Sequence, residues 1–331
     1  MALELKALGG DVMVHFRIFV TLMLVFIPSA LGNPKDCDFE AQSSWPIAEE
    51  LKESSGVAYD QERAWLYQVN DSGNEAAIWK TDIQGKKLQK ISLEGIKNID
   101  FEDVSIGACP GGSENKCFFV ADIGDNLQSR RDDQIHTIHL FDLKGMSTSL
   151  SMKPLSSIPL IYPDRIHNAE SLAIHPHHPY AYILTKEYEG ILFKTVMPAK
   201  LFRLDLSKDQ SLPSDGKPIL LTEVGTIDIG TLAGSSSALP TAMEFSPDGE
   251  WLYILTYKNV VVIKNTGWAN LSAPFPVVWE RDQNFFVIQI EEQKQMEALA
   301  FISNDQFVVT SEGKKGKAII YNCRPKALPH Q

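Results

Sequence analysis

The chain is poor in cysteine and carries no surplus of positive charge. Its 331 residues include only four cysteines, so disulfides cannot replace a hydrophobic core in stabilising it. Acidic side chains outnumber basic ones by 42 to 31, which gives a formal net charge of −11. Such a chain lacks the positive field that attracts phosphate backbones. We therefore expect a globular protein whose partners do not include nucleic acid.

Long apolar runs are absent beyond the first 32 residues. Residues 18–26 are almost continuously apolar, and residues 30–32 offer small side chains at a cleavage position. This pattern predicts a secretory signal peptide over residues 1–32, with Met13 as an alternative start. The run is short for a membrane span, and a retained anchor is the alternative. We expect residues 33–331 to form one domain that is secreted or periplasmic, monomeric and without a membrane span.

The rest of the chain shows no convincing amphipathic helix after residue 55. Short apolar runs alternate with turns rich in Gly, Pro, Asn and Asp, and the chain holds 21 glycines and 18 prolines. Runs of this length and composition are typical of β-strands. The clearest are residues 65–69, 118–121, 181–184, 251–255 and 307–309.

A repeat of paired strands organises these runs. In each of five units a polar residue precedes a small apolar strand, and a second strand follows and ends in another polar residue. The first row is Ser55, Glu102, Glu170, Thr241 and Glu297. The second row is Asn70, Asp122, Thr185, Thr256 and Thr310. Further strands follow each pair, and radially repeated four-stranded units are the blades of a β-propeller. The sequence predicts an all-β fold, a single β-propeller of five four-stranded blades, with six blades as the alternative.

The fifth unit lacks an outer strand, and residues 37–47 form an extended segment without a partner. We expect this N-terminal segment to complete the last blade and close the ring. Cys37 would then lie beside Cys323, and a Cys109–Cys117 disulfide would close the enlarged turn of the second unit. A disulfide across the ring closure should contribute about 4–5 kcal/mol by loop entropy. Free or differently paired thiols are the alternative.

Acidic residues of both rows should meet at one mouth of the central channel, because each row lies at the same end of its hairpins. Carboxylates gathered on one axis repel each other unless something neutralises them. Ca²⁺ prefers oxygen ligands of the kinds found there. The predicted metal ligands are Glu102, Asp122, Glu170 and Glu297. Salt bridges to Lys186 or Lys258, and simple hydration, are the alternatives. Glu244, three residues beyond Thr241, is expected to face away from this mouth.

Loops after the second strands should share this mouth and combine acids, amides and bases. A cation and an anionic group bound together are what phosphate-ester chemistry requires. The candidate ligand-binding residues are Asn70, Asp71, Asp125, Asn126, Arg130, Arg131, Lys186 and Lys258. For a hydrolase, the candidate catalytic residues are Glu102, Asp103 and Glu170. The alternative for any single loop is ordinary turn chemistry.

Several stretches resemble a family of exported bacterial propeller proteins that are described as WD40-like or phytase-like and are mostly uncharacterised. The matching stretches are NDSGN (70–74), IDFEDVSIG (99–107), FVADIGDN (119–126), NAESLAIHP (168–176), TAMEFSPDGEWLYILTY (241–257), EALAF (297–301) and VVTSEG (308–313). The resemblance touches all five units and implies a propeller of calcium-dependent, esterase-like ancestry. Propeller phytases differ in blade number and cation-site motifs, so the resemblance assigns no catalytic residue.

The sequence is compatible with three functions. The first is a secreted propeller with a cation-binding mouth that holds a small or anionic ligand. The second is a metal-dependent hydrolase of phosphoesters or other esters. The third is a platform for an unknown protein partner, because the same fold serves unrelated functions. The expected cofactor is Ca²⁺, and no nucleotide or organic cofactor is indicated.

Overall fold

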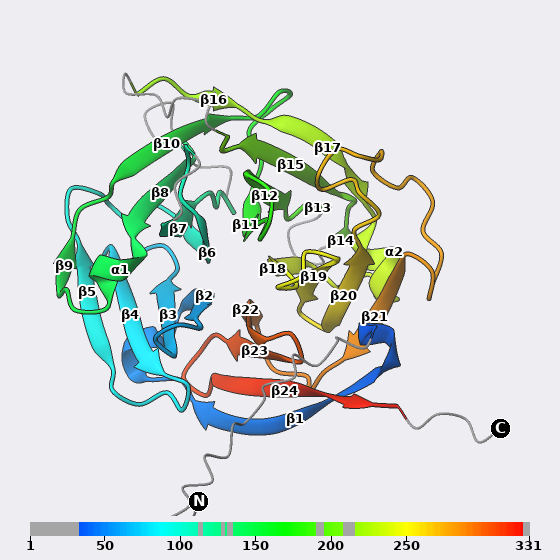
Figure 1. The fold of residues 1–331 in the computed structure, drawn as a ribbon, viewed down its shortest axis with the longest axis horizontal. Helices are drawn as coiled ribbons and strands as arrows, with labels where there is room; N and C mark the ends of the chain where they lie inside the picture. Colours follow the sequence, from blue (N-terminus) through cyan, green and yellow to red (C-terminus); the bar gives the residue numbers. More distant parts are fainter. Residues whose placement is uncertain are drawn as a thin grey trace, which may run out of the picture. The chain divides into compact units, whose positions relative to one another are not determined.

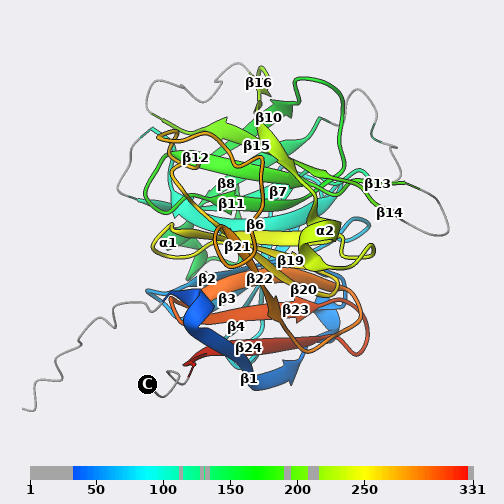
Figure 2. The same cartoon turned by 90° about the vertical axis from the view of Figure 1, so that its right-hand side faces the viewer.

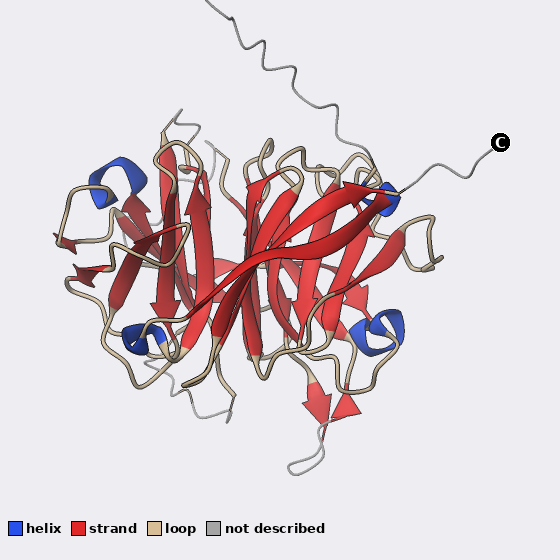
Figure 3. Cartoon of the chain, turned by 90° about the horizontal axis from the view of Figure 1, so that it is seen from below, coloured by secondary structure: helices blue, strands red, loops and turns tan. Residues whose placement is uncertain are grey.

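The computed structural model describes residues 33–111, 115–126, 130, 135–189, 195–207 and 216–326. The predicted signal peptide and Arg131 lie outside these residues. Strands dominate, and the helices are short pieces between them (Figure 3). They are the 3₁₀ turns η1 (Pro34–Asp36) and η2 (Glu49–Leu51) and the helices α1 (Leu143–Met146) and α2 (Ile229–Ala233). No helix among the described residues is long and apolar enough to cross a membrane.

Five sheets surround a central axis as the blades of a propeller (Figure 1). This confirms the predicted five-bladed fold, and the six-bladed alternative is wrong. Blade 1 holds β2 (Ser54–Asp60), β3 (Trp65–Asn70), β4 (Ala77–Asp82) and β5 (Gln89–Leu93). Blade 2 holds β6 (Phe101–Ala108), β7 (Lys116–Asp122), β8 (Thr137–Asp142) and β10 (Ser156–Ile161). Blade 3 holds β11 (Ala169–Ile174), β12 (Tyr180–Thr185), β15 (Ala199–Asp205) and β17 (Thr222–Ile227).

The last two blades follow the same plan. Blade 4 holds β18 (Pro240–Phe245), β19 (Trp251–Thr256), β20 (Asn259–Lys264) and β21 (Phe285–Gln289). Blade 5 holds β22 (Met296–Ser303), β23 (Gln306–Ser311), β24 (Lys317–Pro325) and β1 (Cys37–Pro46). The inner strands β2, β6, β11, β18 and β22 contact one another in a closed cycle around the axis.

Short additional strands depart from the four-stranded plan. β9 (Ser151–Met152) adds a parallel edge to blade 1, and β16 (Ile219–Leu220) adds one to blade 2. Each comes from the chain between the third and fourth strands of the next blade, so it ties two neighbouring blades together. A separate hairpin, β13 (Tyr188–Glu189) with β14 (Thr195–Val196), projects beside blade 3 (Figure 2).

Apolar side chains fill the five interfaces between adjacent blades. Successive residues of a strand point to opposite faces, so one strand serves two interfaces. In β7, Phe118 packs in the core between blades 1 and 2, while Phe119 packs between blades 2 and 3. In β19, Leu252 and Tyr253 divide in the same way between the two neighbours of blade 4. Burial on both faces explains why these strands read as continuous apolar runs.

The ring closes through the N-terminal strand, as predicted. β1 pairs antiparallel with β24, and blue and red strands lie side by side in Figure 1. The Cys37–Cys323 disulfide joins these two strands, with a Cα–Cα distance of 5.1 Å. The Cys109–Cys117 disulfide closes the hairpin turn of blade 2, with a Cα–Cα distance of 4.9 Å. Both predicted pairings are therefore confirmed, and none of the four cysteines is free.

Candidate functional site

Each inner strand begins with a β-bulge, and the extra residue is a member of the first predicted polar row. In blade 2, Phe101 pairs with Asp122 and Asp103 pairs with Ala121, so Glu102 has no partner across the ladder. A bulge redirects the side chain of the unpaired residue. The five unpaired residues are Ser55, Glu102, Glu170, Thr241 and Glu297. The repeat in the sequence is thus a repeat of bulges at one end of the ring.

The second predicted polar row lies beside the bulges. Its residues do not line the cavity that opens at this end of the ring. Its members pair with the residue before each bulge, as Thr185 does with Ala169. Blade 5 differs, because Met296, the residue before its bulge, pairs with Ser311 and not with Thr310. Strand β23 continues one residue further than predicted. Besides bulge residues, the cavity is lined by residues that come immediately after the second strand of a blade. They are Asp71, Lys186, Tyr257 and Glu312.

This cavity, which we call the acidic mouth, has a volume of about 140 Å³. Six carboxylates line it, from four blades and the segments that precede them. They are Glu53, Asp71, Glu102, Glu170, Glu297 and Glu312. Among the described lining residues, Lys186 is the single base. Negative charge is therefore concentrated at one end of the central axis.

Two carboxylates of the acidic mouth, Asp71 and Glu102, converge with Asp100 from the adjoining loop. Oxygens of Asp71, Asp100 and Glu102 all lie within 4.8 Å of one another. The Glu102 side chain is 3% exposed, and its Oε1 has no hydrogen-bond partner. A Cβ at Gly124 would lie 2.0 Å from that oxygen and 2.5 Å from Asp100 Oδ2. Glycine is thus needed for the close approach, and the three carboxylates can supply oxygen ligands to a hard cation.

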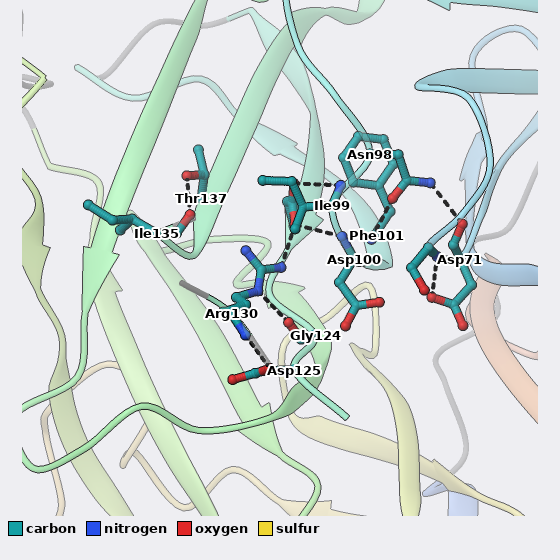
Figure 4. Close-up of polar contacts among 12 residues, drawn as sticks. Asp71, Asn98, Ile99, Asp100, Phe101, Gly124, Asp125, Arg130, Ile135 and Thr137 are labelled. Atoms are coloured by element: carbon teal, nitrogen blue, oxygen red, sulfur yellow. Dashed lines mark hydrogen bonds and ion pairs between the residues drawn. The ribbon is translucent and has the colours of Figure 1, made fainter. Parts of the chain in front are cut away.

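The loop that carries Asp100 is held from behind by Asp122. Asp122 accepts hydrogen bonds from the backbone amides of Asp100 at 3.0 Å and Ile99 at 3.4 Å. It also forms a buried ion pair with Arg130, whose Nε donates to the Gly124 carbonyl (Figure 4). Asp122, a predicted metal ligand, and Arg130, a predicted anion ligand, therefore neutralise each other behind the mouth. They position Asp100 and Gly124.

Lys186 occupies the other side of the mouth. Its Nζ lies 2.9 Å from Glu170 Oε2 and 3.0 Å from the Tyr257 hydroxyl, and the side chain is 5% exposed. Glu170 therefore has a counter-ion, unlike Glu102. Lys258 does not line the mouth and pairs with Glu292.

The remaining predicted residues divide between the mouth and its surroundings. Asn126 lines the mouth and accepts a hydrogen bond from Asn168 at 3.2 Å. Asp125 accepts one from the Arg130 backbone amide at 3.0 Å, and Asn70 donates to the Glu50 carbonyl. These last two side chains shape the loops that border the mouth.

Asp103 lies below the mouth, at the level where the inner strands pack most closely. Its carboxylate accepts hydrogen bonds from the backbone amides of Val104 and Leu172, each at 2.8 Å. A Cβ at Gly56 would lie 2.8 Å from the Asp103 Cα, so the inner strands of blades 1 and 2 touch there. Asp103, a predicted catalytic residue, is 1% exposed and joins adjacent blades in this structure.

Crowding and burial raise the pKa values of several acids in and beside the mouth. Burial, together with repulsion from neighbouring carboxylates, raises the pKa of Glu102 well above its usual range. Burial and repulsion from Asp71 raise the pKa of Asp100 to about 7. Burial raises the pKa of Glu297 to about 8, although Lys186 opposes this shift. A bound cation would replace the protons on these acids and relieve the repulsion.

In the presence of a chelator, the protein should lose stability as the pH rises from 7 to 9. Asp100 and Glu297 hold protons in the folded chain in this window but not in the unfolded chain, because their folded pKa values are raised. Stability then falls with rising pH, by about 1–2 kcal/mol for shifts of this size. Urea unfolding at both pH values measures the loss, and Glu297→Gln should reduce it. Equal stability at pH 7 and 9 would contradict the electrostatic account.

Comparisons with known proteins found solved structures that are similar to this chain only at low sequence identity. No family model matches the chain, and no curated protein matches its sequence. A luciferin-regenerating enzyme is 12% identical, with coverage of 86% of this chain and 95% of that chain and a TM-score of 0.44. The PQQ-bound aldose sugar dehydrogenase of Streptomyces coelicolor is 9% identical, with coverage of 87% and 98% and a TM-score of 0.47.

These similarities assign no function, because identities near 10% and TM-scores below 0.5 are too low. The phytase-like relationship likewise stays a prediction. The protein's own blades define its class, which is a five-bladed β-propeller with an acidic mouth at one end of its central axis. Asp100, Glu53 and Glu312 were missed as site residues in the sequence. Asp100 had a usable signal, since it stands two residues before Glu102.

Proposed function

We propose that the protein is an exported β-propeller whose acidic mouth binds Ca²⁺ and, beside it, a small anionic ligand. The observation that carries this proposal is the buried, unpartnered Oε1 of Glu102 within the cluster of Asp71, Asp100 and Glu102. A buried charged oxygen without a donor is costly, and a cation removes that cost. The two disulfides support export, because disulfides persist in oxidising compartments.

Calcium fits these residues better than magnesium. Ca²⁺ accepts six to eight oxygens in irregular arrangements, whereas Mg²⁺ demands a near-octahedral shell and keeps several waters. Three carboxylates from a loop, a strand bulge and a neighbouring blade form an irregular set. The remaining coordination positions can take water or an oxygen of an anionic ligand. Lys186, across the mouth, can contribute positive charge toward the same ligand.

Calorimetric titration with CaCl₂ at pH 7.5 tests this proposal. We expect one Ca²⁺ per chain, and at least about tenfold weaker binding in Asp100→Asn, because one of three charged ligands is lost. Gly124→Ala should also weaken binding, since its Cβ would occupy the space between Glu102 and Asp100. Asp38→Asn, an exposed position on β1, is the matched control. Unchanged binding in Asp100→Asn would refute the assignment.

A metal-dependent phosphoesterase is the second candidate function, and one observation favours it. Glu297 has a pKa of about 8 and lies in the same cavity as the carboxylate cluster and Lys186. A carboxyl group that holds a proton near neutral pH can act as a general acid. Calcium-dependent hydrolysis of p-nitrophenyl phosphate that is lost in Glu297→Gln would favour this candidate. Calcium binding without hydrolysis would favour the non-catalytic binding protein. A platform for a protein partner would require neither calcium binding nor hydrolysis.

A further inference from the structure

A second cavity opens at the other end of the central axis. Its volume is about 290 Å³, and all five inner strands line it. The lining residues are Ala58 of β2, Ile106 of β6, Ile174 of β11, Glu244 of β18 and Ala300 of β22. We call this cavity the lower pocket. Its size suits a small organic molecule, and its position matches the prediction that Glu244 faces away from the acidic mouth.

Glu244 places a carboxyl group in a cavity whose lining mixes apolar side chains, such as Ile106 and Phe301, with polar ones. Its Oε2 lies 3.4 Å from the Ser105 hydroxyl, and its other hydrogen bond comes from the Phe245 backbone amide. Within the described part of the chain, no ion pair joins Glu244 to a base. Asp60, the other acid that lines the pocket, pairs with Arg63 at 2.8 Å. Of the two acids that line the pocket, Glu244 is thus the one without an ion pair among the described residues.

The chemistry of these walls selects the class of ligand. Ionising a carboxyl group among apolar side chains is costly unless a positive charge accompanies it. Burial accordingly raises the pKa of Glu244 well above its usual range. A metal ion would find one unpaired carboxylate, because Asp60 is paired with Arg63, and this is too few charged ligands for calcium or magnesium. A small organic ammonium supplies the charge, and its apolar body can contact Ala58, Ile106 and Ala300.

We infer that the lower pocket binds a small primary ammonium compound with an apolar body and that Glu244 is its counter-ion. Lys116 and His177 also line the pocket, and both side chains are exposed at its edge. Neither forms an ion pair with Glu244 among the described residues. The lower pocket and the acidic mouth share no lining residue, so the inference does not rest on calcium binding.

Binding of three matched probes tests the inference. Phenethylamine carries an ammonium group, 2-phenylethanol replaces it with a neutral hydroxyl, and 3-phenylpropionate replaces it with an anion. Ligand-observed NMR titration should show phenethylamine binding at least about tenfold more tightly than either analogue. Failure of phenethylamine to bind, or equal binding of the alcohol, would overturn the inference. This comparison uses the wild-type protein and needs no variant.

A variant then locates the site. Glu244→Gln keeps the shape of the side chain and should weaken phenethylamine binding at least about tenfold, with 2-phenylethanol unaffected. Glu250→Gln, an exposed position in the turn of the same hairpin, is the control. Phenethylamine binding should be the same in CaCl₂ and in chelator, which separates this site from the acidic mouth. Wild-type affinity in a folded Glu244→Gln protein would overturn the assignment of the counter-ion.

Discussion

Saturating Ca²⁺ is expected to raise the thermal unfolding midpoint of the protein by about 5 °C relative to chelator. A ligand present at a hundred times its dissociation constant stabilises the folded chain by about 2.7 kcal/mol. For a domain of this size, each kcal/mol shifts the midpoint by about 2 °C. Relief of repulsion among Asp71, Asp100 and Glu102 is the physical source of the effect.

Glu102→Gln distinguishes the loss of a calcium ligand from a general loss of stability. The variant removes one buried acid from a crowded cluster, so its midpoint in chelator should equal or exceed that of the wild type. At the same time, its response to Ca²⁺ should disappear. Differential scanning calorimetry of both proteins, with Glu250→Gln as control, measures both effects. A wild-type calcium response in Glu102→Gln would contradict the assigned ligand set.

Loss of the Cys37–Cys323 disulfide should have the largest effect on stability. This bridge spans 286 residues of sequence, whereas Cys109–Cys117 spans eight. Loop entropy predicts about 5–6 kcal/mol for the long loop, slightly above the range expected from the sequence, and about 2–3 kcal/mol for the short one. The long bridge also fixes β1 against β24, the one pairing that closes the ring.

Urea unfolding of the two double Cys→Ser variants measures this difference. The variant at positions 37 and 323 should unfold at the lower denaturant concentration and lose the contacts of β1 first. The variant at positions 109 and 117 should retain most of the stability, because its hairpin is held by the β6–β7 ladder. Equal losses in both variants would show that the ring closure does not depend on the covalent link.

Much of this fold could be predicted because the repeat is local. Apolar runs of fixed spacing reveal strands, and an unpaired N-terminal segment reveals the closure. The same spacing placed Glu102, Glu170 and Glu297 at one mouth, since each is the unpaired residue of a bulge. Bulges themselves leave little trace in a sequence beyond this polar residue at the start of a small strand.

Other parts of the site depend on contacts that spacing does not encode. Asp122 is a carboxylate of the kind that binds metal ions, yet it forms a buried ion pair with Arg130, which the strand pattern does not predict. Asp100 enters the cluster because Asp122 holds its backbone and Gly124 leaves space for its carboxylate. Similarly, Lys186 pairs with Glu170 and not with another acid of the mouth, and its Nζ also contacts the Tyr257 hydroxyl of the neighbouring blade. Tertiary packing therefore decides which charged residues face each other.

The most direct test of the cation site is an anomalous difference map from crystals grown with Ca²⁺. The account predicts one strong peak about 2.3–2.6 Å from carboxylate oxygens of Asp71, Asp100 and Glu102. The same map from Asp100→Asn crystals should lack this peak. A map without a peak in the acidic mouth, or with the peak at a different set of residues, would contradict the central claim.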